Sequence, residues 1–315
     1  MHAKTLLPPV RAAFERLIDY AGLFPPAALD ERAALEEYDA TIDGPNEWLV
    51  GRFVAPLSRL ETLAVLRDAE RPLPMTLILD VDRDARGWFD SLGAAAAHAG
   101  AIRREDSEIA IQAVEIPLPE VQAARESADA PIAQASALLE RSALHGLPAY
   151  LELPAKMSGD RLDAAMTALA RAGAFAKLRC GGIVADAFPS VENIAEFIAA
   201  AARHGVAFKA TAGLHHPVRH FDAATGFTMH GFFNLLVAAA LAPDVSQAEL
   251  IEVVAEEDAQ AFSFDATSLR WRDRRVDIGQ IGQMRAKAFH GYGSCSVQEP
   301  VDDLIGVGVL PPASR

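Results

Sequence analysis

Short apolar runs rich in Val, Ile and Phe alternate along this chain with longer, alanine-rich segments of helical period. This alternation is typical of repeated βα units, in which parallel strands form one sheet and helices cover it. The runs that predict strands are Tyr20–Phe24, Val50–Pro56, Met75–Asp82, Ile109–Pro117, Ala149–Pro154, Phe175–Gly181, Val206–Gly213 and the less regular Phe262–Asp265. Eight strands with helices between them favour a closed (β/α)8 barrel, the TIM barrel.

The alternative architecture is an open α/β sheet of six strands with terminal extensions, because the first and eighth runs are the least regular. No GxGxxG motif follows an early strand, as it often does in doubly wound sheets. No linker rich in Pro, Gly and Ser divides the chain, so we expect one domain over residues 1–315. The long excursion between the seventh and eighth strands predicts extra helices over the rim, and the tail after Asp277 predicts another.

The net charge, the apolar stretches and the few cysteines limit which partners and which compartment we expect for this chain. The formal net charge of −14 disfavours binding to nucleic acid or to an anionic membrane surface. The longest apolar stretch, around Phe232 to Ala242, is shorter than the roughly 20 residues of a bilayer span. With only Cys180 and Cys295 as cysteines and no secretory signal pattern, we expect a cytoplasmic protein.

Charged residues occur near the C-terminal ends of several predicted strands. Alternation puts Lys177 and Arg179 on one face of FAKLRCGG, and Lys209 and Thr211 on one face of VAFKATAG. Acidic residues in comparable positions are Asp80, Glu115 and Glu152. A charge that faces the core costs several kcal/mol unless it is paired, so these residues predict a shared polar cluster. The alternative for each single residue is a structural salt-bridge network; a functional set is favoured because barrel enzymes place their chemistry at this end.

Lys177 and Lys209 are separated by about one βα repeat, which predicts adjacent strands, the sixth and the seventh. A lysine crowded by another cation and partly desolvated loses its proton near neutral pH and becomes a nucleophile toward carbonyls. In this feature the chain resembles class I aldolases of the deoxyribose-phosphate aldolase type. The resemblance implies a Schiff-base role for Lys177, a pKa-lowering role for Lys209, and an acidic helper that is Asp80 or Glu115. Alternatively, Lys177 binds an anionic substrate together with Arg179.

The segment TAGLHHPVRH follows the seventh strand and is dense in His and Arg. We expect His215 or His216 to act as a general acid or base, and Arg219 to contact substrate. Metal ligation by both histidines with a carboxylate such as Glu152 is the alternative. Neither HxH nor HExxH occurs, so the spacing is not a specific metal signature.

Two further segments, LIDYAGLFPPA and GSCSVQEP, have the glycines and prolines of shaped loops. Two interpretations are open for these segments: ordinary loop packing, or a contribution to the rim through Asp19, Tyr20, Ser294, Ser296 and Glu299, with Tyr20 as a substrate contact. Cys295 is expected to be a free structural thiol. Together, DYAGLFPPA, KLRCGG, KATAGLHHP and GSCSVQEP resemble a family of bacterial proteins. That resemblance implies one shared site built from four segments and implies no particular reaction.

The leading functional hypothesis is therefore a lyase, aldolase-like, that acts without a cofactor on a small anionic carbonyl metabolite. A hydrolase or lyase that uses a divalent metal at His215 and His216 is the second hypothesis. A non-catalytic protein that binds an anion at the same basic rim is the third. A homo-oligomer is compatible with each of the three.

Overall fold

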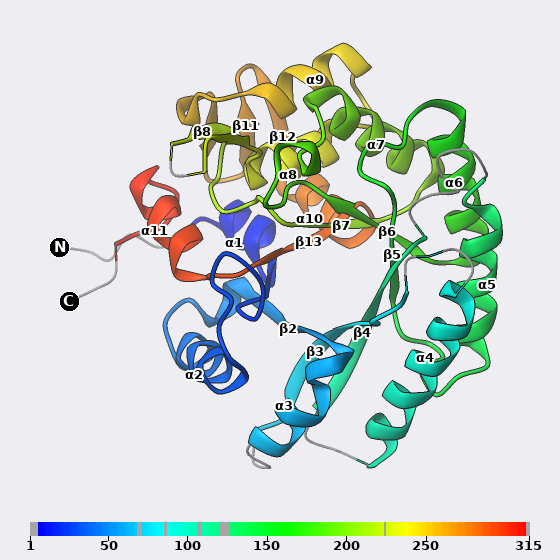
Figure 1. The fold of residues 1–315 in the computed structure, drawn as a ribbon. Coiled ribbons are helices and arrows are strands. Elements are labelled where there is room, and N and C mark those ends of the chain that lie inside the picture. Colours follow the sequence, from blue (N-terminus) through cyan, green and yellow to red (C-terminus); the bar gives the residue numbers. More distant parts are fainter. Residues whose placement is uncertain are drawn as a thin grey trace.

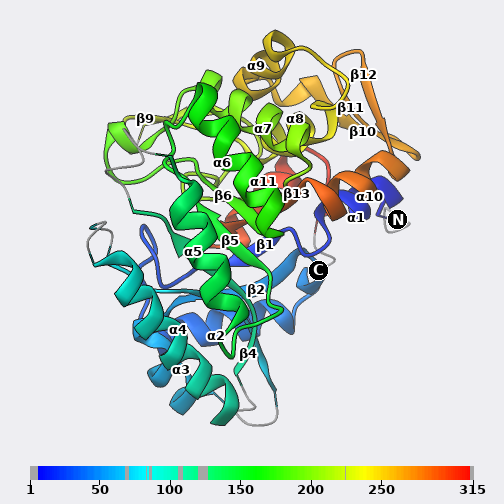
Figure 2. The same ribbon diagram turned by 90° about the vertical axis from the view of Figure 1, so that its right-hand side faces the viewer.

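The computed structural model describes residues 6–67, 71–82, 84, 87–105, 109–119, 127–223 and 225–312. Eight parallel strands close into a barrel, and helices surround it (Figures 1 and 2). The barrel strands are β1 (Ile18–Tyr20), β2 (Val50–Pro56), β3 (Leu73–Ile78), β4 (Ile109–Pro117), β5 (Ala149–Glu152), β6 (Phe175–Arg179), β7 (Phe208–Thr211) and β13 (Phe289–Ser294). The predicted (β/α)8 class is confirmed, and the six-stranded open sheet is wrong.

Helices follow the strands in the alternation that the sequence predicts. They are α1 (Pro8–Phe14), α2 (Glu31–Ile42), α3 (Leu60–Leu66), α4 (Trp88–Glu105), α5 (Asp129–Glu140), α6 (Gly159–Ala172), α7 (Val191–His204), α8 (Phe232–Leu241), α9 (Gln247–Ala255), α10 (Ile278–Lys287) and α11 (Gln298–Gly306). Helix α7 shows why the boundaries fall where they do. Ser190 and Asn193 form a capping box at its start, and Gly205 ends it with a φ of 63°, a conformation that glycine adopts without strain. No helix among the described residues is both long and apolar enough to cross a membrane.

The predicted eighth strand is the largest error in the barrel; the first strand lies earlier than predicted, because β1 is Ile18–Tyr20 and the sequence predicts Tyr20–Phe24. Phe262–Asp265 does not enter the barrel; Phe262–Phe264 forms β10, which pairs antiparallel with β11 (Ser268–Trp271) and, through it, with β12 (Arg274–Asp277). The barrel is closed instead by β13, which pairs with both β1 and β7. Its sequence, FHGYGS, lacks the apolar alternation of a strand because glycines occupy alternate positions.

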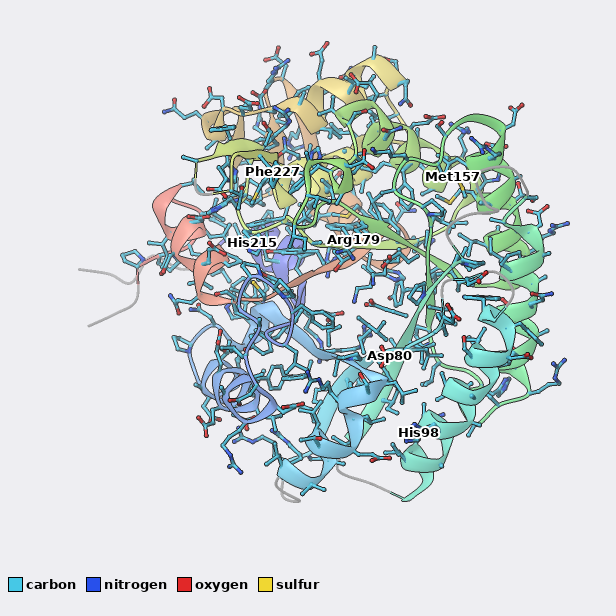
Figure 3. The ribbon with its side chains drawn as sticks, in the orientation of Figure 1. Asp80, His98, Met157, Arg179, His215 and Phe227 are labelled. Carbon is cyan, nitrogen blue, oxygen red and sulfur yellow. The ribbon has the colours of Figure 1, made fainter. Side chains whose placement is uncertain are left out.

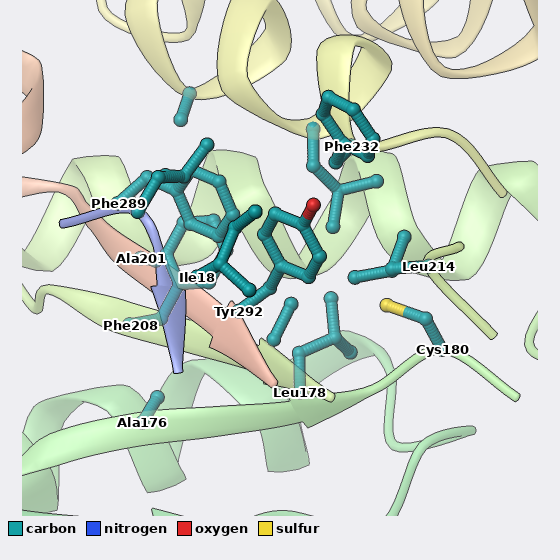
Figure 4. Packing of buried hydrophobic residues seen from close by; sticks show 14 of the residues in the cluster. Ile18, Ala176, Leu178, Cys180, Ala201, Phe208, Leu214, Phe232, Phe289 and Tyr292 are labelled. Carbon is teal, nitrogen blue, oxygen red and sulfur yellow. The ribbon is translucent and has the colours of Figure 1, made fainter. Parts of the chain in front are cut away.

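Between β7 and β13 the chain adds a hairpin of β8 (His220–Asp222) and β9 (Phe227–Met229), helices α8, α9 and α10, and the small antiparallel sheet. The additional helices expected here are confirmed, and so is the helix expected after Asp277, which is α10; α8, however, packs on the outer face of the barrel and not over its rim. Helix α11 begins at Gln298, within the GSCSVQEP segment for which the sequence predicts a shaped loop. Helix α8 packs on the barrel through aromatic residues (Figure 4). The rings of Phe232 and Tyr292 stack at 5.2 Å, so the residues of β13 that face away from the barrel interior anchor this addition.

Candidate active site

Five ionisable side chains meet inside the barrel, and we call them the interior cluster: Asp19, Glu115, Glu152, Lys177 and Lys209. Lys177 and Lys209 are register partners on the adjacent strands β6 and β7, as the sequence predicts. Their ion pairs reach Glu115 on β4, and Lys209 also reaches Asp19 on β1. Neither β1 nor β4 neighbours β7 in the barrel, so these contacts cross its interior.

Glu115 lies at the centre of this cluster. One of its carboxylate oxygens is 2.6 Å from Lys177 Nζ, and the other is 2.6 Å from Lys209 Nζ. Each lysine has a second carboxylate of its own, Glu152 at 2.8 Å for Lys177 and Asp19 at 2.6 Å for Lys209. All five residues are at most 7% exposed, so all four ion pairs lie away from water.

The electrostatics of the cluster correct one expectation. Burial by itself lowers the pKa of Lys177 and Lys209, but their carboxylate partners outweigh it and raise both pKa values above the usual range. Burial likewise raises the pKa of Glu115, and the two ammonium groups outweigh it and hold that pKa at about 2. The prediction of a lysine that loses its proton near neutrality is wrong for the resting protein. The sequence pattern placed Glu115 and Glu152 in a shared cluster with the lysines, but it did not show that these carboxylates and Asp19 contact the two amines directly.

One level closer to the C-terminal ends of the strands, Arg179 and Thr211 are register partners on the same two strands. Arg179, which is labelled in Figure 3, is half-buried, and its Nε donates to the carbonyl of Gly181. Within the described part of the chain Arg179 forms no ion pair. On β13 the residues level with Lys209 and Thr211 are Gly291 and Gly293, so this strand sends no side chain inward at either level. The mouth of the barrel therefore holds a guanidinium group above the buried amines.

Below the interior cluster, aromatic and polar residues form the floor of the barrel. The hydroxyl of Tyr150 and Nδ1 of His290 are 2.8 Å apart, and Lys209 Nζ lies 5.6 Å from the centre of the Tyr150 ring.

Arg52 lies 3.9 Å from Asp19 and adds a third positive charge beside the three carboxylates of the interior cluster. The cluster is therefore close to electroneutral, which a buried ionic network requires.

A second set of ionisable residues lies after the ends of β7 and β13, and we call it the rim cluster: His215, His216, Cys295, Glu299 and Asp303. Nδ1 of His215 is 3.0 Å from Glu299 and 4.0 Å from Sγ of Cys295. Nδ1 of His216 is 2.5 Å from Asp303. Hydrogen bonds to Cys295 and then to Glu299 raise the pKa of His215 to about 10, so its ring is protonated at neutral pH.

Three other predicted contacts lie apart from the interior cluster. The ring of Tyr20 packs against Tyr38 and Phe53 while the neighbouring Asp19 reaches Lys209, so the structure does not bring Tyr20 to the lysines. Asp80, after β3, accepts a hydrogen bond from the backbone of Ser58. Arg219 pairs with Glu257 and lines a pocket of about 420 Å³ beside the start of α7.

Sequence reasoning missed Asp19 as a partner of Lys209, and it did not connect Cys295 with His215. The signal for Asp19 was a carboxylate between the apolar Ile18 and Tyr20, which is an expensive position unless a cation meets it. For Cys295 no sequence signal exists, because its partner is 80 residues away in the chain.

The proposed metal ligands are engaged elsewhere. Glu152 pairs with Lys177, whereas the two histidines pair with carboxylates of α11. Across the residues that the structure describes, no three His, Cys, Asp or Glu side chains form a group that could hold a metal ion.

No protein-family model matches the chain, and a search of curated proteins found no match. Similar solved structures include an aldolase described as QR15, which is 13% identical with a TM-score of 0.46 over 77% of this chain and 88% of that one. A deoxyribose phosphate aldolase from Aeropyrum pernix, described as tetrameric, is 12% identical with a TM-score of 0.45 over 78% of this chain and 91% of that one. Likenesses at this level assign no reaction, so the chemistry has to come from this chain's own residues.

Proposed function

We propose that this chain is a lyase of the aldolase type, in which a buried lysine forms an imine with a small anionic carbonyl compound. The observation that supports it is the pair Lys177 and Lys209, bridged by Glu115 inside the barrel, with Arg179 two residues farther along β6 toward the mouth. Barrel enzymes carry out their chemistry at this end of the strands.

The choice of lysine at these two positions supports amine chemistry. The sequence has five lysines among 29 basic residues, and two of the five lie within the barrel. An arginine could balance the same carboxylates and bind them through two hydrogen bonds, but it stays protonated and forms no imine. Most basic residues of the chain are arginines, but these two positions carry lysine, which can act as a nucleophile.

We assign the imine to Lys177 because Arg179 extends from the same face of β6, two residues closer to the mouth. Two residues of a strand span about 6.6 Å. A compound whose acid group binds Arg179 can thus present a carbonyl carbon to Lys177 a few bonds away. The missing side chains at Gly291 and Gly293 favour a ligand on this side of the interior.

The raised pKa of Lys177 requires that its proton moves before attack, and Glu152 lies at contact distance to accept it. The free amine then adds to the carbonyl carbon, and loss of water leaves an iminium. The iminium carries the same positive charge as the original ammonium, so the carboxylates that stabilise one also stabilise the other. The iminium accepts the electron pair of the bond between the α- and β-carbons of the substrate, and this bond breaks. The reaction therefore needs no cofactor.

When the bond breaks, the β-hydroxyl of the substrate loses its proton and becomes the carbonyl of the released fragment. The enamine that remains on Lys177 then needs a proton at its α-carbon, and protonated His215 is suited to supply it. In this proposal His215 therefore starts the reaction protonated and acts as a general acid.

Borohydride trapping tests the proposal. The protein is incubated with a panel of small aldehydes and 2-oxo acids, reduced, digested and mapped by mass spectrometry. We expect a stable adduct on Lys177, because reduction converts the imine to a secondary amine. Lys177→Arg should keep the positive charge and lose the adduct, whereas Lys156→Arg, at an exposed lysine, should retain it.

An adduct confined to exposed lysines, or none with any compound, would contradict the imine. An adduct on Lys209 would keep the lyase and exchange the roles of the two lysines. Binding of an anion without turnover or adduct would favour the non-catalytic hypothesis.

A further inference from the structure

The mouth of the barrel carries a thiol beside an imidazole, and the lyase chemistry does not use this thiol. Cys295 directly follows β13, and His215 lies four residues beyond the end of β7. Because β13 and β7 are parallel neighbours, the two residues emerge side by side at the C-terminal end of the barrel.

The contacts of His215 define a charged environment for this thiol. Its Nδ1 lies 4.0 Å from Sγ of Cys295 and 3.0 Å from Glu299, and both are acceptors for one ring proton. Other titratable groups around this site include His216, which is 3.9 Å from Glu299, and Asp303, which pairs with His216. Asp222 acts on Glu299, Cys295 acts on the buried Tyr20, and Glu299 and Asp303 act on the buried Tyr292. The raised pKa of His215 keeps the ring cationic, so the group beside the sulfur can hold and release a proton during a reaction at Sγ.

We propose that Cys295 is a nucleophile paired with His215, and that it is a site of covalent addition for small α,β-unsaturated carbonyl compounds. In the addition the thiolate sulfur forms a bond to the β-carbon. The electron pair of the carbon–carbon double bond moves toward the carbonyl, and the α-carbon takes the proton of the imidazolium. The products are a thioether and a neutral imidazole, so no oxidant, reductant or further reactant is needed.

The second cysteine of the chain is an internal control. Cys180 is wholly buried, and Figure 4 shows it among Leu178, Leu214 and Tyr292. Burial in this apolar layer raises the pKa of Cys180, which favours the unreactive thiol. Cys295 keeps 7% of its surface exposed and has a polar partner. The two thiols therefore differ in solvent exposure and in the charge of their surroundings.

The experiment measures addition of N-ethylmaleimide, an α,β-unsaturated imide, to the full-length native protein between pH 5 and 10. Peptide mapping gives the rate at each cysteine. We expect Cys295 to react at least about tenfold faster than Cys180 at pH 7. His215→Asn removes the imidazole beside Sγ and should slow Cys295 about tenfold at pH 7. Cys180→Ser should leave the fast reaction in place, and Cys295→Ser should abolish it.

Equal, slow reaction of both cysteines in the native protein would overturn the proposal, and this comparison needs no variant to fold. An unchanged rate at Cys295 in folded His215→Asn would also overturn it. The inference does not rest on the lyase: trapping at Lys177 can fail while Cys295 reacts as expected, and the reverse result is equally distinguishable.

Discussion

The interior cluster pairs lysines with carboxylates and the rim cluster pairs histidines with carboxylates, in different surroundings. The interior cluster is built from five barrel strands, all of its members are buried, and each lysine contacts two carboxylates. The rim cluster joins the segment after β7 to the segment after β13, and its Glu299 is 42% exposed. Strands hold charges rigidly where water cannot compensate a lost partner, whereas the rim leaves its groups free to exchange protons with solvent.

The largest effect on stability should come from the centre of the interior cluster. Glu115→Gln preserves the size of the side chain but leaves two buried ammonium groups without their shared partner. We expect the free energy of unfolding to fall by about 3–5 kcal/mol, as measured by denaturant unfolding. Glu61→Gln, at a side chain that is 75% exposed, should change it by no more than about 0.5 kcal/mol. Similar losses in the two variants would mean that the interior charges are not coupled.

The next largest effect should appear in ligand binding at the mouth. Arg179→Gln removes a guanidinium that has no carboxylate partner among the described residues, so stability should change little. We expect the affinity for small carboxylates or sugar phosphates to fall about 10- to 100-fold, because a hydrogen bond to a charged group contributes about 1.5–3 kcal/mol. Thermal shift as a function of ligand concentration measures this, with Arg203→Gln on α7 as the control. If both variants bind equally well, Arg179 is not the anion site.

The rim should respond less to the loss of a carboxylate. Glu299→Gln breaks the contact with His215, but both groups remain accessible to solvent in part. We expect the free energy of unfolding to fall by at most about 1 kcal/mol. A loss as large as that for Glu115→Gln would place the rim in the same rigid class as the interior and remove the distinction between the two clusters.

The smallest effects, and the most specific, are those of pH. The folded pKa of His215, about 10, is above its ordinary value of 6.5, so its contribution to stability is complete below pH 6.5 and is lost as pH rises through 10. The pKa of Glu115, about 2, is below its ordinary value of 4.5, so its contribution is lost as pH falls from 4.5 toward 2. The difference in melting temperature between wild type and His215→Gln should therefore shrink in alkali, and that between wild type and Glu115→Gln should shrink in acid. Differences that stay constant across these ranges would contradict the two pKa values.

Local patterns in the sequence were sufficient for much of the fold and part of the site. Alternation placed seven barrel strands within a few residues, and it put Lys177 with Arg179 and Lys209 with Thr211 because the side-chain period of a strand is a local property. The spacing of one βα repeat predicted that the two lysines would be neighbours. These features need only geometry that a single strand or a single repeat contains.

Tertiary structure alone decided how the barrel closes and which charges meet. β13 is a strand because β1 and β7 bind its two edges, although its glycines resemble a turn. The approach of Asp19, Glu115 and Glu152 to the lysines reversed the expected direction of the lysine pKa, and closure brought Cys295 to His215. Electrostatic interactions depend on distance in space, and the closed barrel brings together residues whose separation along the chain carries no trace of that contact.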